Sequence, residues 1–339
     1  MGPGMRNPHL LARALFIFVM AIALAIAATL LPDNPYQRYQ LLDGTVYAKG
    51  KWMYQRVHFD PAPIDVAILG DSRTLIGLQP DRIAAQLAQA GKPVQVANLS
   101  LVGEGRNIQW VLARDLMKVK RPKVLILTVS SGPSPWGHDT FRYFASASDI
   151  WREAGYGLYD ARKNVMYLPF RQLKLLAAQV APGVFGLEPA FDPKTYSPAQ
   201  DNWTTPRTSA DGKFQDPQKR MTREALLEQF KKAAWEVGRH SAMPRPLRRI
   251  TDADDRVYLD LIATEARKHG VKVIFVAIPE FHRHDGIQER RYYESIGPIQ
   301  DNADIAERDD LYMDVNHTNA RGSQLVSDRV AAVVAPLLP

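Results

Sequence analysis

The chain has 339 residues, of which 46% are apolar and 23% are charged, and it contains no cysteine. These fractions are typical of a folded protein with one or two domains and exclude a largely disordered chain. The lack of cysteine excludes disulfides, thiol catalysis and Cys-ligated metal sites. The formal net charge is +7, and much of the basic surplus lies in residues 192–250.

The first predicted element is an apolar segment at residues 15–31, which no charged residue interrupts. Arg6 and Arg13 precede it, and a basic segment followed by an apolar run is typical of an export signal or a membrane anchor. The positive-inside rule then places the N-terminus in the cytoplasm and the rest of the chain outside the inner membrane. We expect residues 1–31 to form an uncleaved transmembrane signal-anchor. Cleavage within the Ala-rich stretch Ala25–Ala28 is the alternative.

An alternation of strands and helices follows residues 32–62, which are expected to be an irregular, aromatic-rich connector. Short apolar, β-branched runs predict strands, and apolar residues at helical spacing predict helices. The predicted strands are 64–69, 94–99 and 124–129, and the predicted helices are 80–90 and 107–119. Strand–helix–strand–helix–strand with short links is the pattern of a parallel sheet with helices on both faces.

The alternation stops at residue 130 and resumes at about residue 252. Residues 131–250 are rich in proline and aromatic residues, and only a helix at 221–237 is predicted within them. The elements predicted after them are a strand at 271–278 and helices at 252–269, 289–296 and 319–337. We therefore expect an α/β domain at 63–339 that is interrupted by an insertion at 131–250.

The residues suited to chemistry follow the predicted strands. The first strand runs into Gly70-Asp71-Ser72. In an open parallel sheet, ligands bind beyond the carboxyl ends of the strands. A serine there can act as a nucleophile if nearby backbone N–H groups hold the negative charge that develops.

Two further motifs complement this serine. After the second strand, Asn98 is followed by Gly103, whose N–H has no side chain in front of it and can serve an oxyanion. Near the C-terminus, Asp314 precedes His317 by three residues. That spacing lets the carboxylate fold back onto the imidazole and orient it toward a serine.

Gly-Asp-Ser at 70–72, the spacing of Asn98 and Gly103, and Asp-x-x-His at 314–317 together resemble the SGNH/GDSL hydrolase family. The resemblance covers residues 62–135 and 252–339. It implies a flavodoxin-like three-layer α/β/α fold with a parallel sheet, here preceded by one N-terminal transmembrane helix. It also implies that Ser72 is the nucleophile, His317 the general base and Asp314 the acid that orients it. The Ser72 and Gly103 amides would then be the oxyanion donors.

One block departs from the family pattern. The family has Gly-x-Asn-Asp after its third strand, and the asparagine is an oxyanion donor. Here the chain reads Thr-Val-Ser-Ser-Gly-Pro at 128–133, without an asparagine. Either Ser130 or Ser131 supplies a hydroxyl instead, or the oxyanion hole is weaker or completed on binding. The loss of one donor costs about 10²–10³ in rate, which favours a specialised enzyme over a broad esterase.

Other polar residues near the strand ends are candidates for contact with substrate. Arg73 and Arg106 flank two of the motifs, and each binds an anionic group or forms a salt bridge within the protein. His138 either lines the cleft or is structural. His282 belongs to a His-x-His loop after the fourth strand, where it contacts substrate, lies on the surface or binds a metal. No further metal ligand is evident, so no metal is expected. A full dinucleotide motif is also lacking, so no cofactor is expected.

The anchor and the incomplete block are similar to membrane-anchored, extracytoplasmic SGNH-like proteins that modify cell-envelope polymers. That resemblance implies a serine O-acyltransferase or esterase that transfers or removes O-acetyl groups on an envelope glycan or exopolysaccharide in the periplasm. It also implies a membrane-bound O-acyltransferase as partner. A non-catalytic scaffold or glycan-binding subunit is the alternative, and a soluble lipase of broad range is a third reading. No nucleic-acid partner is expected, because the basic segment lacks interleaved aromatic residues.

Overall fold

The computed structural model describes residues 8–129, 137–156, 160–208, 212, 214–240 and 253–339. Their contacts divide the chain into two compact units. A helical unit combines Met1–Leu41 with Arg142–Ala190, and an α/β unit combines Leu42–Phe141 with Phe191–Pro339. Each unit is therefore assembled from two segments that lie far apart in the sequence.

The α/β unit is built on a parallel sheet. Within the described residues the sheet has five strands in the order β2-β1-β3-β6-β7, all of them parallel. The strands are β1 (Val66–Leu69), β2 (Val96–Asn98), β3 (Val124–Thr128), β6 (Lys272–Ala277) and β7 (Ile299–Asp301). The direction of winding reverses between β1 and β3, and ligands of doubly wound sheets bind beyond the strand ends at such a point. The predicted α/β class and parallel sheet are confirmed.

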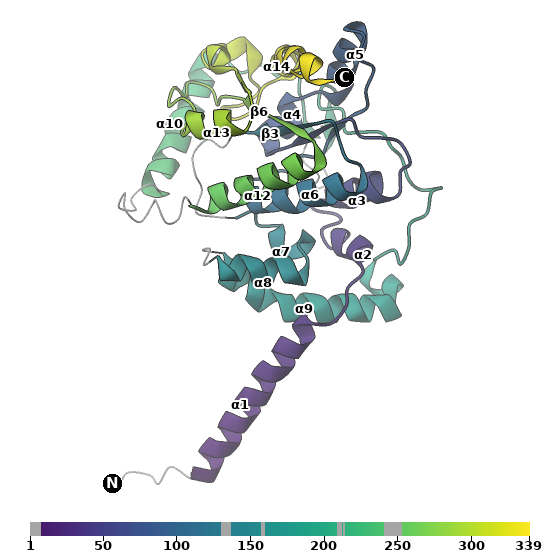
Figure 1. Cartoon of the computed structure of the whole chain (residues 1–339). Helices are drawn as coiled ribbons and strands as arrows, with labels where there is room; N and C mark the ends of the chain where they lie inside the picture. The colour runs from purple at the N-terminus through teal and green to yellow at the C-terminus, as the bar shows by residue number, and fades with distance from the viewer. Residues whose placement is uncertain (1–7, 130–136, 157–159, 209–211, 213, 241–252) are drawn as a thin grey trace, which may run out of the picture. The chain divides into compact units, whose positions relative to one another are not determined.

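Helices cover both faces of this sheet (Figure 1). On one side α5 (Pro80–Gln89) packs against α14 (Ala320–Val334), and on the other α6 (Arg106–Val119) packs against α12 (Ala253–His269). The two central strands β1 and β3 are fully buried and almost wholly apolar, because both faces of the sheet are covered. The other elements described in this unit are α3 (Lys49–His58), α4 (Ser72–Gly77), β4 (Arg207–Thr208), β5 (Phe214–Gln215), α10 (Arg223–His240), α13 (Arg290–Ile296), η2 (Ala303–Ile305), η3 (Asp309–Leu311) and η4 (Ala335–Leu337).

Two expectations are corrected. Residues 32–62 are not an irregular connector, because they contain α2 (Pro35–Tyr39) and α3 (Lys49–His58). In α3 only Met53 and Val57 form a buried apolar pair one turn apart, and the surrounding aromatic and basic residues hide that spacing. The sequence also gave no sign of β7, because three residues are too few to show a strand pattern.

The helical unit contains α1 (Pro8–Thr29), α2, α8 (Ala147–Gly155), α9 (Ala161–Val180) and η1 (Pro182–Phe185). Along the sequence, the division between the two units falls within the short helix α7 (Phe141–Phe144). Arg171 of α9 is wholly buried and donates hydrogen bonds of 2.7 Å to the carbonyl oxygens of Arg142 and Ala145. Pro169 lies inside α9, and this proline is one reason why no helix was predicted there.

The apolar N-terminal segment forms α1, which is long and apolar enough to cross a membrane. Its side chains are exposed almost throughout, and only Ala28 and Thr29 at its C-terminal end are buried. A largely apolar helix whose side chains are exposed over most of its length is typical of a segment that contacts lipid.

Candidate active site

Ser72 is the first residue of α4, directly beyond the carboxyl end of β1. Gly70 makes this sharp turn possible, because a Cβ at that position would lie 2.5 Å from Thr74 Oγ1. Asp71 caps the helix by accepting a hydrogen bond from the Thr74 N–H. Gly70 and Asp71 are thus both needed for the turn, which leaves the Ser72 side chain partly exposed.

His317 and Asp314 lie in one tight turn just before α14. Asp314 Oδ1 accepts hydrogen bonds from the N–H groups of Asn316 (2.8 Å) and His317 (2.9 Å). The Met313 N–H donates to the His317 carbonyl oxygen and closes the turn. Both Asp314 carboxylate oxygens then lie 3.0 Å from His317 Nδ1. The three-residue spacing produces this contact without help from the rest of the fold.

The fold brings this turn to Ser72. His317 Nε2 lies 2.9 Å from Ser72 Oγ, across 245 residues of sequence. Because the Asp314 carboxylate accepts a hydrogen bond from Nδ1–H, the lone pair of Nε2 faces the serine hydroxyl. The result is a continuous serine–histidine–aspartate chain of hydrogen bonds, the geometry by which a catalytic triad is recognised.

Asp314 is held in its ionised form. Burial alone would raise its pKa, but hydrogen bonds from the His317 side chain and from two backbone N–H groups lower the pKa below its ordinary value. An ionised Asp314 stabilises the imidazolium that forms when His317 takes up a proton.

The two backbone N–H groups expected from the sequence to be the oxyanion donors are those of Ser72 and Gly103. Within the described part of the chain, neither the Ser72 N–H nor the Gly103 N–H has a hydrogen-bond partner. Gly103 has a φ of 97°, a conformation that favours glycine. Asn98 serves a structural purpose: its side-chain amide donates to the carbonyl oxygens of Thr74, Leu75 and Leu78. It thereby ties α4 to β2.

His138 is buried directly behind the Gly103 loop. Its Nδ1 accepts a hydrogen bond from the Thr140 N–H, so Nε2 carries the hydrogen and donates it to the Val102 carbonyl oxygen at 2.8 Å. A Cβ at Gly103 would lie 3.0 Å from Nε2. Burial lowers the pKa of His138 to about 4. Of the two readings of His138, the geometry favours the structural one, in which this neutral side chain supports the Gly103 loop.

Arg73 is paired with three carboxylates of the protein. It contacts Asp71 (2.5 Å), Glu104 (2.6 Å) and Glu280 (3.0 Å) and is 7% exposed. Burial would lower its pKa, but these charges raise the pKa instead. The salt-bridge alternative is the one seen, with Glu280 as a partner that the sequence did not reveal.

Arg106 is also used within the protein. Its guanidinium pairs with Asp255 at 3.0 Å and donates to the Thr128 carbonyl oxygen at 3.1 Å. It therefore joins α6 to α12 and to the end of β3. Ser130 and Ser131 lie outside the described residues.

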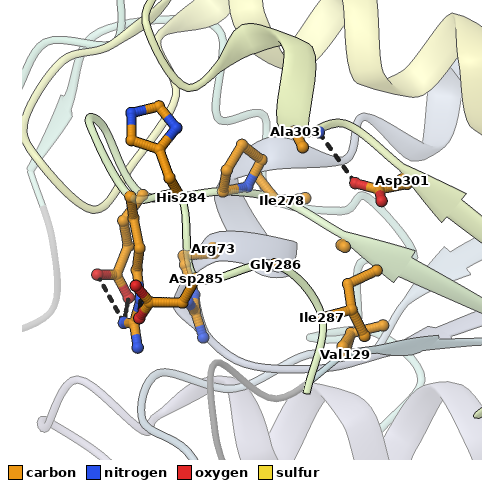
Figure 2. Close-up of a pocket in the computed structure, with 13 residues that line it drawn as sticks. Arg73, Val129, Ile278, His284, Asp285, Gly286, Ile287, Asp301 and Ala303 are labelled. Carbon is orange, nitrogen blue, oxygen red and sulfur yellow. Dashed lines mark hydrogen bonds and ion pairs between the residues drawn. The ribbon is translucent and has the colours of Figure 1, made fainter. Parts of the chain in front are cut away.

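A pocket of about 160 Å³ opens at the same edge of the sheet, beyond β3, β6 and β7 (Figure 2). Its apolar side is formed by Val129, Ile278 and Ile287, and its polar side includes Arg73 and His284. None of the three triad residues lines it, but Arg73 is the chain neighbour of Ser72. The pocket therefore adjoins the Ser72 turn without containing it.

A second histidine group lies after β6. His282 Nδ1 and His284 Nε2 lie 2.5 and 2.8 Å from the same Glu307 carboxylate oxygen, and Arg223 pairs with the other oxygen. The three ligand atoms lie within 4.8 Å of one another, so they could hold a metal ion. A metal would have to displace the hydrogen bonds that already satisfy Glu307. The sequence did not point to Glu307, which lies 23 residues beyond His284.

Comparison with known proteins adds no assignment. No family model matches the chain, and no curated protein matches its sequence.

Proposed function

We propose that this chain is a membrane-anchored serine acyl-transfer enzyme of the SGNH type, which adds or removes an O-acyl group on a cell-envelope glycan. The observation that carries this proposal is the hydrogen-bond chain from Ser72 through His317 to Asp314. A hydroxyl, an imidazole and a carboxylate in this order are the working parts of nucleophilic acyl transfer.

The reaction has two halves. Ser72 Oγ attacks the carbonyl carbon of the acyl donor while His317 Nε2 takes the serine proton. The tetrahedral intermediate collapses, and His317 returns that proton to the leaving oxygen. Ser72 is then acylated. In the second half His317 takes a proton from a sugar hydroxyl or from water, whose oxygen attacks the acyl carbon, and it finally gives the proton back to Ser72.

The N–H groups of Ser72 and Gly103 support this reaction as donors to the oxyanion. In the family, the third donor is the asparagine of the block that follows the third strand. In this chain residues 130–133 of the corresponding block lie outside the part that the structure describes. Each such donor is worth about 10²–10³ in rate. The lack of the family's asparagine favours a specialised enzyme over a broad esterase.

The N-terminal anchor indicates on which side of the membrane the enzyme would act. With Arg6 and Arg13 ahead of the apolar run at 15–31, the positive-inside rule favours a triad on the outer side of the bacterial inner membrane. A glycan or exopolysaccharide is the acceptor or substrate in that compartment. A membrane-bound O-acyltransferase that moves acyl groups across the bilayer is the corresponding partner.

The test is intact-mass spectrometry of the full chain in detergent, incubated with 4-nitrophenyl acetate and, separately, with a fluorophosphonate. We expect an adduct of one acetyl or one phosphonyl group on the wild type and none on Ser72→Ala. Circular dichroism of both proteins controls for folding. An equal extent of labelling in both proteins, or no labelling in either, would contradict an activated Ser72.

The alternative is a non-catalytic scaffold or glycan-binding subunit, and the missing asparagine of the third block favours it. In that case Ser72→Ala retains full function when it replaces the wild type in a deletion strain, and the protein forms no adduct. Substitutions in the basic residues of 192–250 would then abolish glycan binding. These outcomes separate the alternative from the enzyme.

A further inference from the structure

Helix α9 carries an apolar stripe that the protein does not cover. Met166, Phe170, Leu173 and Val180 are 67%, 70%, 51% and 84% exposed, and Val184 in η1 continues the row at 81%. Successive members are three, four or seven residues apart, so within α9 they share one face of the helix. Such a row is costly in water and indicates a surface that is covered in the working protein.

The inner face of α9 already forms the core of the helical unit. Leu168, Leu175 and Ala178 are wholly buried there. At 3.6 residues per turn, Phe170 lies roughly 200° around the helix from Leu168. The exposed stripe is therefore a second apolar face, opposite the one that holds the unit together, and folding of the unit does not explain it.

The position of α9 next to the end of α1 indicates what covers the apolar stripe. Gln172 of α9 donates a hydrogen bond of 2.6 Å to the Leu31 carbonyl oxygen, just past the end of α1. Arg171 lies 3.6 Å from Asp33. Figure 1 shows α9 lying across the C-terminal end of α1. A 22-residue helix is about 33 Å long, close to the ~30 Å of a bilayer's hydrocarbon core. When α1 spans the bilayer, α9 lies at the level where the hydrocarbon ends.

The charges of α9 suit that level. Arg162, Lys163 and Lys174 are exposed on the same helix, and its sequence contains no acidic residue. Apolar side chains on one face with basic residues beside them are typical of helices that lie in the membrane interface. Basic side chains there are attracted by anionic lipid headgroups.

We propose that α9 is an interfacial helix, which seats the stripe from Met166 to Val184 at the boundary between headgroups and acyl chains of the bilayer that α1 crosses. This inference rests on the membrane anchoring in the proposed function and is independent of the triad. It gives the helical unit two attachments to the membrane, one spanning and one lying flat. The unit is then held in a fixed orientation on the lipid surface.

Because the chain has no cysteine, single cysteines can carry an environment-sensitive NBD label in the full chain. The informative variants are Phe170→Cys and Val180→Cys. Val19→Cys in α1 reports the anchor, and Ser148→Cys, an exposed position of α8, is the matched control in the same unit. Each is reconstituted in vesicles of phosphatidylethanolamine and phosphatidylglycerol with or without nitroxide-labelled lipid.

We expect nitroxide lipids to quench the labels at Phe170 and Val180 several-fold, as they quench Val19, and to leave Ser148 unchanged. Aqueous iodide should show the reverse order. If Val19 is quenched by lipid but Phe170 and Val180 behave like Ser148, the interfacial assignment is wrong while the anchor stands. Labels shielded from both quenchers would indicate a second copy or a protein partner on the stripe, which also overturns it.

An unquenched Val19 would overturn the anchor and this inference together. Fluorophosphonate labelling of Ser72 in the same four samples is a separate readout. It should be unchanged in all of them, because none of the variants touches the triad. A failure of the proposed chemistry is thus distinguishable from a failure of the membrane assignment.

Discussion

Two groups of histidine and carboxylate follow strands of the same sheet, yet their chemistry differs. In the triad, His317 lies between Asp314 and the Ser72 hydroxyl, so its second nitrogen faces a group that can react. In the other group the carboxylate of Glu307 is the centre, and His282, His284 and Arg223 all point to it. The residue types are similar, and the order of the contacts decides that only the triad is arranged for proton transfer.

The largest expected difference between the two groups appears when one histidine is removed from each. His317→Ala should reduce turnover of 4-nitrophenyl acetate by roughly 10⁴–10⁶-fold, because Ser72 loses its base. His282→Asn should change turnover little. Asparagine tolerates the left-handed backbone that His282 adopts at φ 61°. Equal losses in the two variants would show that the second group takes part in the chemistry.

The carboxylates give the next largest contrast. Asp314→Asn should lower turnover by about 10⁴-fold, because an amide cannot favour the tautomer that leaves Nε2 unprotonated. Glu307→Gln should leave the rate near that of the wild type. The measurement is the initial rate for both variants at the same pH, with circular dichroism as the folding control. A near-normal rate for Asp314→Asn would mean that His317 does not depend on it.

The buried His138, which belongs to neither group, should affect the pH dependence of stability. Its folded pKa of about 4 lies below that of an unfolded histidine, so between these values the unfolded chain binds more protons than the folded one. Stability should therefore fall as the pH drops from about 6.5 to 4, by an amount on the order of 3 kcal/mol. We expect His138→Gln to be less sensitive over this range in thermal unfolding followed by tryptophan fluorescence. Parallel curves for the two proteins would exclude this role.

The smallest expected effect comes from the Glu307 ion pairs. The pKa of Glu307 is lowered from 4.5 to about 2. The largest cause is the hydrogen bond from the Arg223 guanidinium, and hydrogen bonds from His282 and His284 add to it, while partial desolvation opposes the shift. Because the folded pKa is depressed, the stabilisation is complete above pH 4.5 and is lost as the pH falls toward 2.

Since Glu307 is exposed to solvent, this contribution is at most about 1 kcal/mol. Glu307→Gln should be slightly less stable than the wild type at pH 6, and the difference should be smaller near pH 2.5. Chemical denaturation at the two pH values measures the difference. A gap that widens in acid would contradict the assigned ion pairs.

The sequence was most informative where structure is local. The strands β1, β2, β3 and β6 and the helices α5, α6, α10, α12, α13 and α14 lie where the apolar patterns place them, to within a few residues at each end. The contact between Asp314 and His317 follows from a three-residue spacing, and the turn at Ser72 follows from Gly70 and Asp71. These features depend on neighbours in the chain, so their pattern is visible in the sequence.

The sequence was least informative in residues 131–250 and in the connector. Helix α9 has apolar residues on two opposite faces and a proline inside it, so no single stripe stands out. The short elements β7 and α2 contain too few residues to show a period. Arg73 had a partner beside it in Asp71, but Glu280 comes from 207 residues away. No spacing rule reveals such a pair.

The sequence by itself therefore determined the α/β class, the apolar N-terminal helix and the residue types at the strand ends, because each depends on short-range periodicity or on a turn of a few residues. Only the tertiary structure decided that His317 meets Ser72, that Glu307 closes the second histidine group and that α9 leaves an apolar face uncovered. Those results depend on which surfaces pack together. Packing is a property of the whole chain, and no segment alone specifies it.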